Sequence, residues 1–222
     1  MLKKRDINAL SLFFAALLLA GCSSTPDIPA FTASGYLADR GAVRIWRKNE
    51  AHQAIHIRTV YTPFNGDAME FSDYSWREGK LLNIERHVKG AQPDDVTLRF
   101  DAQGSLNFMQ RQLAGRREAV DSDAVDLYTF DAQRMLHISD ALLNGRVFLR
   151  QGHWLGGREA QSCEGTRLTP DFDADTLSKL TQQQRASASP LMIAWLEAPE
   201  GVQLLRVSHE DECSWQPKEA DF

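Results

Sequence analysis

Three cysteines have the most distinctive chemistry in this sequence: Cys22, Cys163 and Cys213. A thiol can carry a lipid, bind a metal ion or join a second thiol in a disulfide. No Cys-x-x-Cys spacing occurs, which gives little support to a thiol-exchange enzyme. The use of each cysteine therefore has to be inferred from the segments around it.

Cys22 follows a short apolar segment that has a basic start. Residues 3–5 read Lys-Lys-Arg, and residues 9–20 are apolar at all but one position. A helix of that length rises about 18 Å, whereas the hydrocarbon core of a membrane is about 30 Å thick. The pattern therefore predicts a secretory signal rather than a permanent membrane span.

The end of this signal, Leu19-Ala-Gly-Cys22, resembles the lipobox of bacterial lipoproteins. Small Ala20 and Gly21 would let a peptidase reach the backbone, and the sulfur of Cys22 would carry the lipid. We expect residues 1–21 to be removed and the acyl chains on Cys22 to hold the protein in the membrane. The residue after Cys22 is Ser23 rather than Asp. The resemblance to lipoproteins therefore favours attachment to the outer membrane, with the protein facing the periplasm. A plain signal peptide cut elsewhere is the alternative.

Cys163 and Cys213 then remain as an even pair in an oxidising compartment, which predicts a disulfide between them. It would close a loop of about fifty residues and stabilise the fold by about 4 kcal/mol on the chain-entropy model. Two reduced thiols, one of them reactive, are the alternative.

Metal sites and catalytic sites have weaker support. His52 and His56 have the spacing of ligands on one helix face, but on a strand they lie about 13 Å apart. Residues 210–212, Glu-Asp-Glu, are interpreted as a solvated charged edge rather than a calcium site. Common hydrolase and nucleotide-binding motifs do not occur, so we predict no catalytic residue, metal ligand or cofactor.

Most of the chain between Tyr36 and Arg111 shows the alternation typical of β-strands. Apolar positions recur with period two, for example at Val43 and Ile45, and turn sequences such as Asn65-Gly66 separate the segments. This pattern predicts an antiparallel meander with one buried and one wet face, as a curved sheet or partial barrel. Five tryptophans lie in or beside strands and are expected to pack in the core, or to line a cleft if partly exposed: Trp46, Trp76, Trp154, Trp195 and Trp215.

Two helices are predicted on or beside the sheet, so the fold class is mainly β (α+β). Asp121 or Ser122 can cap the first, Asn144-Gly145 can end it, and Asp131 could break it in two. Its apolar stripe is expected to pack on the sheet rather than to line a ligand groove. Asp173 can cap the second, and a hairpin around residues 198–201 follows.

Length and charge limit the domain organisation and the partners. We expect a signal peptide at 1–21, a lipidated cysteine with a flexible tether at 22–34, and a single β-rich domain at 35–222. Residues 1–21 carry three basic and one acidic residue, so the remainder has a net charge of −7 rather than −5. An acidic chain without a basic block is a poor candidate for binding nucleic acid.

Several strings of this chain resemble the YjaH-type lipoproteins of enteric and related bacteria, over most of its length. That family has no known function, so the resemblance implies a location and no activity or functional residue. The strings are Ala33-Ser-Gly-Tyr-Leu-Ala-Asp39, Gly41-Ala-Val-Arg-Ile-Trp-Arg-Lys48, Arg99-Phe-Asp-Ala-Gln-Gly104, Phe108-Met-Gln-Arg111, Ala194-Trp-Leu-Glu-Ala-Pro-Glu-Gly201 and Cys213-Ser-Trp-Gln-Pro217.

The sequence thus favours a non-catalytic binding or structural role in the cell envelope. The expected partners are the membrane, through the N-terminal lipid, and an envelope protein or apolar ligand. An enzyme acting on cell wall or lipid is one alternative, and clustered polar groups with perturbed pKa values in a pocket would support it. An inhibitor or partner-capping module is the other.

Overall fold

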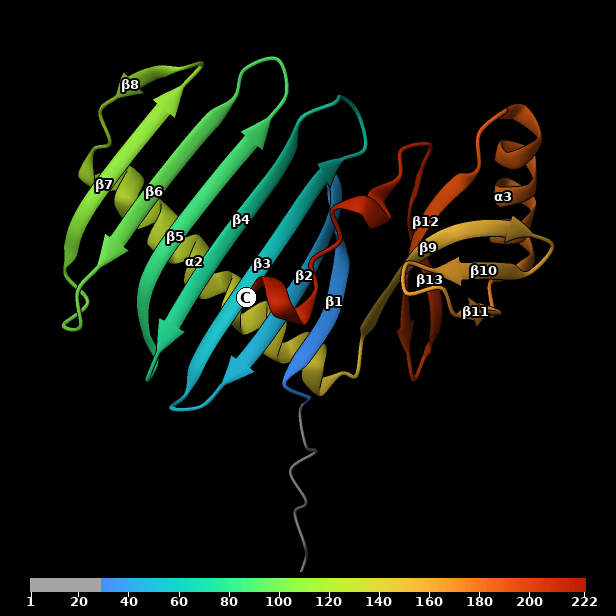
Figure 1. Cartoon of the computed structure of the whole chain (residues 1–222), viewed down its shortest axis with the longest axis horizontal. Helices are drawn as coiled ribbons and strands as arrows, with labels where there is room; N and C mark the ends of the chain where they lie inside the picture. The colour runs from blue at the N-terminus through green and yellow to red at the C-terminus, as the bar shows by residue number, and fades with distance from the viewer. Residues whose placement is uncertain (1–28) are drawn as a thin grey trace, which may run out of the picture.

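The computed structural model describes residues 29–222, and its first sheet is a meander of eight antiparallel strands (Figure 1). Each strand pairs with its neighbour in sequence, as the regular turn signals predict. The strands are β1 (Phe31–Ala38), β2 (Gly41–Glu50), β3 (Ala54–Pro63), β4 (Met69–Arg77), β5 (Lys80–Lys89), β6 (Asp94–Phe100), β7 (Leu106–Leu113) and β8 (Arg116–Glu118).

A long helix, α2 (Ser122–Asn144), crosses one face of this sheet (Figure 1). The Asp121 side chain caps it by accepting a hydrogen bond from the backbone N–H of Ala124 (2.8 Å), and Gly145 follows its last turn. Asp131 does not break the helix, since its side chain points to Arg134 and Tyr74. The apolar stripe of α2 packs on the sheet as predicted, with Ala132, Met135 and Leu136 in the shared core.

A second antiparallel sheet of five strands was not predicted as a separate sheet. Its order is β11-β10-β9-β12-β13, and α3 (Ala174–Ala186), capped by Asp173, packs against it. The strands are β9 (Phe148–Gly156), β10 (Glu159–Ser162), β11 (Arg167–Leu168), β12 (Leu191–Ala198) and β13 (Gly201–Ser208). The hairpin of β12 and β13 turns at the predicted residues.

The two sheets share a core on the face of the first sheet that is opposite α2. Ala42, Trp46 and Val60 of the first sheet contact Leu149 and apolar residues of β12 and β13 in the second. Seven consecutive residues of β2, 41–47, are therefore buried, so the predicted alternation of a buried and a wet face is wrong for this strand. Arg44, which the alternation would place on the solvent-exposed face, is buried between the sheets, and Trp46 of the same face is buried there too.

Residues 211–222 form a strap that runs over the same face of β2 and β3 (red in Figure 1). The strap contains two single-turn 3-10 helices, η1 (Glu212–Ser214) and η2 (Glu219–Asp221). Two aromatic side chains attach it to the first sheet. Trp215 packs edge-on against Trp46, and Phe222 packs edge-on against Phe31, with ring centroids 6.3 Å and 5.6 Å apart.

Over residues 29–222 the structure confirms a mainly β fold with two long helices, and neither sheet of this part closes into a barrel. Strand β1 begins at Phe31, so residues 31–34, predicted to belong to the tether, are part of the sheet. Among the residues described, no helix has the length and apolar character needed to cross a membrane.

Candidate functional site

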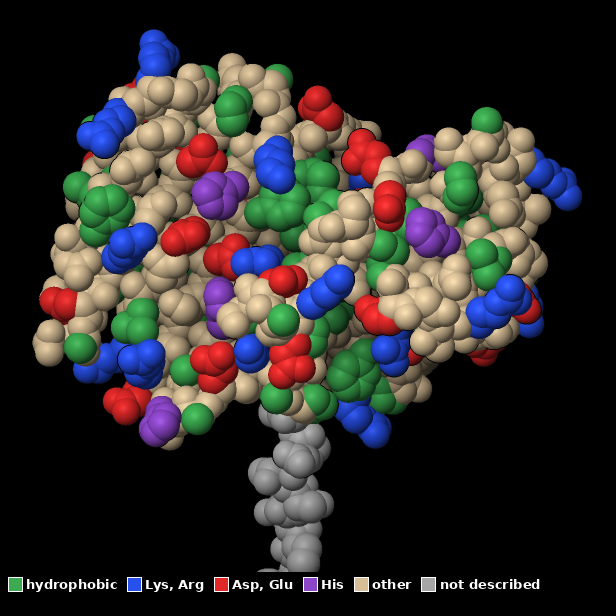
Figure 2. All heavy atoms as spheres, in the orientation of Figure 1, with side chains coloured by type: hydrophobic (Ala, Val, Ile, Leu, Met, Phe, Trp, Pro, Cys, Tyr) green, Lys and Arg blue, Asp and Glu red, His purple; other side chains and the backbone are tan. Residues whose placement is uncertain are grey.

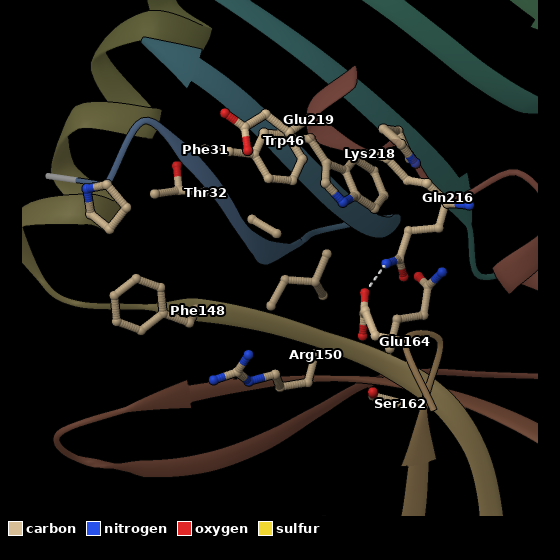
Figure 3. A pocket seen from close by; sticks show the side chains of 15 residues that line it. Phe31, Thr32, Trp46, Phe148, Arg150, Ser162, Glu164, Gln216, Lys218 and Glu219 are labelled. Carbon is tan, nitrogen blue, oxygen red and sulfur yellow. Dashed lines mark hydrogen bonds between the residues drawn. The ribbon is translucent and has the colours of Figure 1, made fainter. Parts of the chain in front are cut away.

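A cleft of about 480 Å³ opens between the two sheets, beside the strap (Figure 3). Phe31 and Trp46 line it from the first sheet, and Phe148 and Leu149 line it from β9. Polar groups surround these apolar walls. They are contributed by Thr32 of β1, by Arg150, Gln151, Ser162 and Glu164 in or after β9 and β10, and by Gln216, Lys218 and Glu219 of the strap.

The strap closes one side of the cleft through polar contacts with the second sheet. The side-chain amide of Gln216 donates a hydrogen bond to Glu164 Oε1 (2.7 Å), which Figure 3 shows as a dashed line. On the wall formed by β1, the hydroxyl of Thr32 is buried and has no hydrogen-bond partner in the described chain. A buried polar group without a partner costs free energy, so this hydroxyl is a local cost to the stability of the cleft wall.

A buried ion pair holds the strap beside the cleft. Arg44 has no exposed surface and donates to Glu212 Oε2 at 2.5 Å, while Arg206 donates to Glu212 Oε1 at 2.9 Å. The guanidinium of Arg44 also donates to Gln151 Oε1 (2.7 Å), a residue of the cleft wall. Burial lowers the pKa of Arg44, and the attraction of Glu212 opposes this shift.

The interpretation of residues 210–212 as a solvated edge is therefore wrong for Glu212, which is only 2% exposed. Sequence reasoning missed the network of Arg44, Gln151 and Glu212 because its members lie up to 168 positions apart. One local signal was present. Arg44 interrupts a β-strand run, Ala42 to Trp46, that is otherwise apolar, and such a residue needs a buried partner.

Cys163 and Cys213 form the predicted disulfide, with Cα atoms 5.2 Å apart. Cys163 follows β10, and its backbone N–H donates to the carbonyl of Gln151 (3.0 Å). Cys213 lies in η1, where Asp211 accepts a hydrogen bond from its backbone N–H (3.1 Å). The disulfide thus joins the strap to the second sheet next to the cleft.

Apart from Trp46, the other residues singled out in the sequence do not line this site. Cys22 lies outside the described residues. His52 is in the turn between β2 and β3, whereas His56 is in β3 and lies 3.4 Å from Asp73. Four tryptophans are buried as expected, and Trp46 also lines the cleft: Trp46, Trp76, Trp154 and Trp195. Trp215 is half-buried in the strap.

A second cavity, of about 410 Å³, lies between the first sheet and α2 and contains charged groups. Asp94 accepts two hydrogen bonds from Arg111 (2.8 and 3.0 Å) and one from Arg86 (3.1 Å), and Arg86 also binds Glu70. The hydrogen bonds from Arg111, with the charge and the single hydrogen bond of Arg86, hold the pKa of Asp94 below its usual value.

Tyr74, whose hydroxyl reaches Asp131 at 3.3 Å, lines the same cavity. Burial, with the charge of Asp131 nearby, raises the pKa of Tyr74. At neutral pH the phenol therefore stays protonated and the Asp94 carboxylate stays ionised and occupied by guanidinium groups. Neither shift brings a group toward neutral pH, where a general acid or base works best, so the arrangement favours an ion-paired structural network over a catalytic one.

We expect the Asp94→Asn substitution to lower the free energy of unfolding at pH 7 by about 1.5–3 kcal/mol, because charged hydrogen bonds are lost. The pKa of Asp94 is lowered in the folded state, so its contribution is complete above the unfolded value of about 3.9 and is lost as pH falls through the folded value. Urea denaturation across pH 2–7 should therefore show the difference between wild type and variant shrinking below about pH 4.

Asp95→Asn is the matched control for this prediction. Asp95 is the next residue on β6 but is exposed, and the side chain of His87, with which it pairs, is 45% exposed, so the substitution should change stability by no more than about 1 kcal/mol. A loss at Asp94 no larger than at Asp95, or a loss that does not depend on pH, would contradict the role given to the network.

In the described part of the chain, one group of three side chains offers metal donors close together: His153, Asp211 and Cys213. Their ligand atoms lie within 4.8 Å of one another. Because Cys213 is in the disulfide, it supplies no thiolate in this state, and two donors are too few for a closed zinc site.

Comparison with known proteins matches residues 33–218 to the model of a family described as "Protein of unknown function (DUF1481)". The chain belongs to the DUF1481 family. It is also 41% identical to the uncharacterized protein YjaH of Escherichia coli (strain K12) over 208 aligned residues. The aligned region covers 93% of this chain and 90% of YjaH. No solved structure matches the chain.

Membership of the DUF1481 family confirms the resemblance predicted from the sequence strings. The matched range begins inside β1 and ends within the strap, so it includes both sheets, both cysteines of the disulfide and the Arg44–Glu212 pair.

Proposed function

We propose that this DUF1481 protein is a lipoprotein of the outer membrane that faces the periplasm and binds a partner, without catalysis, in the cleft between its sheets. The observation that carries the proposal is the cleft itself. Its volume falls in the range of ligand sites, roughly 300–1,000 Å³, and it combines aromatic walls with a few polar groups, as such sites do.

The envelope location rests on the Leu19–Cys22 motif behind a short apolar segment. The disulfide supports it, because disulfides persist in oxidising compartments such as the periplasm. Acidic and basic side chains are interspersed on the face shown in Figure 2, and no single-sign surface that would suit nucleic acid is visible on that face. The membrane partner is therefore reached through lipid on Cys22.

The lining favours an amphipathic polypeptide segment of an envelope protein over a purely apolar ligand. Arg150 and Lys218 place positive charges at the cleft, and Glu164 and Glu219 place negative ones. All four of these charged side chains are exposed and can pair with polar groups of a ligand, while Phe31 and Phe148 can hold an apolar side chain. A wholly apolar molecule would cover exposed charged groups such as Lys218 and Glu219 and offer them no hydrogen bond in place of water.

A photoactivatable amino acid placed at Phe148 should crosslink the partner in intact cell envelopes. The matched control is the same residue at Phe64, which is exposed in the connection between β3 and β4 and lies outside the cleft. We expect a discrete adduct from position 148 and none from position 64, with acyl mass on Cys22 in the same membrane fraction. Equal adducts from both positions, or none from position 148, would reject the cleft as the binding site, and an unmodified Cys22 would reject the anchor.

A further inference from the structure

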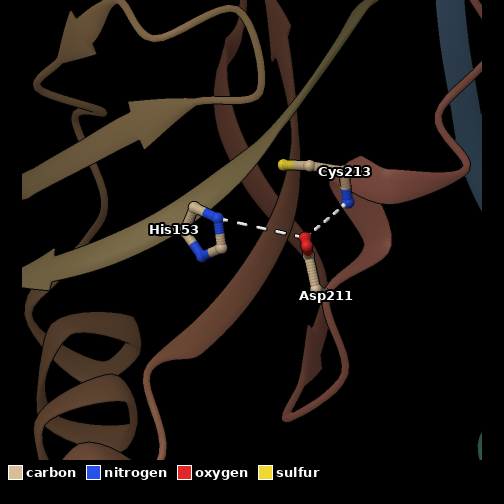
Figure 4. A group of neighbouring side chains, drawn as sticks. All are labelled: His153, Asp211 and Cys213. Carbon is tan, nitrogen blue, oxygen red and sulfur yellow. Dashed lines mark hydrogen bonds and ion pairs between the residues drawn. The ribbon is translucent and has the colours of Figure 1, made fainter.

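The donors beside the disulfide have a geometry that a metal ion could use. His153 projects from β9 and Asp211 from the strap, with Nε2 and Oδ1 4.0 Å apart (Figure 4). The backbone N–H of Cys213 orients the Asp211 carboxylate. The His153 ring and the Asp211 carboxylate are partly or largely exposed, at 37% and 61%, so an ion can reach them from solvent.

The fourth donor is Cys163, whose sulfur is bonded to that of Cys213. A dithiol reductant would supply two electrons and two protons, breaking the sulfur–sulfur bond to give two thiols while the reductant becomes a disulfide. Both thiols would lose their protons to solvent on binding a metal ion. The reduced protein then offers two thiolates, one imidazole and one carboxylate at one place.

This donor set suits zinc. Tetrahedral zinc takes sulfur at about 2.3 Å and nitrogen or oxygen at about 2.0–2.2 Å, which places donor atoms about 3.5 Å apart. The donor atoms of His153, Asp211 and Cys213 already lie within 4.8 Å of one another, so these three need movements of about 1 Å. The two sulfur atoms, which are bonded to each other in the disulfide, would have to separate to about 3.5 Å after reduction. Two thiolates favour zinc over magnesium or calcium.

We propose that reduction of the Cys163–Cys213 disulfide creates a zinc site formed by Cys163, Cys213, His153 and Asp211. The same two elements, the end of β10 and the strap, are then joined by the metal ion instead of by the covalent bond. The strap keeps its place beside the cleft in both redox states. The site is independent of lipidation and of what the cleft binds.

The test uses purified protein in oxidised form and after dithiol reduction and anaerobic desalting, titrated with Co²⁺ and then with Zn²⁺. We expect one Co²⁺ per reduced chain, with thiolate-to-cobalt charge-transfer absorption that Zn²⁺ abolishes, and no such absorption in the oxidised protein. His153→Ala should weaken binding on the order of tenfold or more. His209→Ala, a nearby histidine that contacts Ser187 and lies outside the donor group, should bind as wild type.

Three outcomes of the metal titration would overturn the proposal, and a fourth concerns refolding. The three titration outcomes are absence of the charge-transfer band in the reduced protein, equal metal binding by the oxidised protein, and unchanged binding by His153→Ala. Circular dichroism monitors the fold throughout. If the reduced chain unfolds, Zn²⁺ should refold it and should fail to refold the reduced His153→Ala variant. A reduced chain that Zn²⁺ does not refold would also overturn the proposal.

Discussion

Replacing Glu212 by alanine is expected to lower the free energy of unfolding by about 3–5 kcal/mol. Its carboxylate accepts hydrogen bonds from Arg44 and Arg206, and Arg44 has no exposed surface. Without the carboxylate, the Arg44 guanidinium would remain buried without its counter-charge, which costs far more than an exposed ion pair contributes. Urea denaturation of both proteins at neutral pH measures the difference.

Glu210→Ala is the matched control, because Glu210 is two positions away and exposed. It should change stability by no more than about 0.5 kcal/mol. The double variant Arg44→Met, Glu212→Leu should recover part of the loss, because it leaves neither charge of this pair in the core. Similar small losses for Glu210→Ala and Glu212→Ala would show that the buried pair does not hold the strap.

Replacing both Cys163 and Cys213 by alanine is expected to lower the free energy of unfolding by about 4 kcal/mol. The bridge joins residues that are 50 positions apart, so it removes many conformations from the unfolded chain. The loss would be a large part of the 5–15 kcal/mol that stabilises a typical domain. Chemical denaturation of the oxidised wild type and the double variant provides the comparison.

The reduced wild type, kept free of metal, should be destabilised to a similar extent as the double variant, which separates loss of the bond from loss of the cysteine side chains. An oxidised wild type that unfolds at the same denaturant concentration as the double variant would contradict this prediction. Two free thiols in protein isolated from the envelope would contradict the disulfide itself.

The elements of the fold that depend on neighbouring residues could be predicted from the sequence. Asp121 and Asp173 cap α2 and α3 as expected, because a cap is decided by the side chain and the next three residues. The hairpin of β12 and β13 is likewise determined locally, by its turn. Predicting the disulfide required only the number of cysteines and an assumption about the compartment in which the protein resides.

The features that depend on packing between distant elements could not be predicted. The division of the strands into two sheets, the burial of β2 on both faces and the cleft all arise where the sheets meet. The alternation of apolar and polar residues along β2 indicates that one face of the strand is buried. It carries no information about which element covers the opposite face. Trp215 and Phe222 were the available signals for the strap, since they are large apolar residues in an otherwise polar stretch.

The meander also implies an order of assembly. In residues 31–118 each strand pairs only with its neighbour in the sequence, so forming the first sheet requires only short loops to close. This segment is also synthesised before the second sheet. The contact of Arg44 with Glu212 spans 168 positions and requires both sheets to be present. We therefore expect the strap to dock last. Oxidation of Cys163 and Cys213 would then attach the strap covalently to two sheets that have already folded.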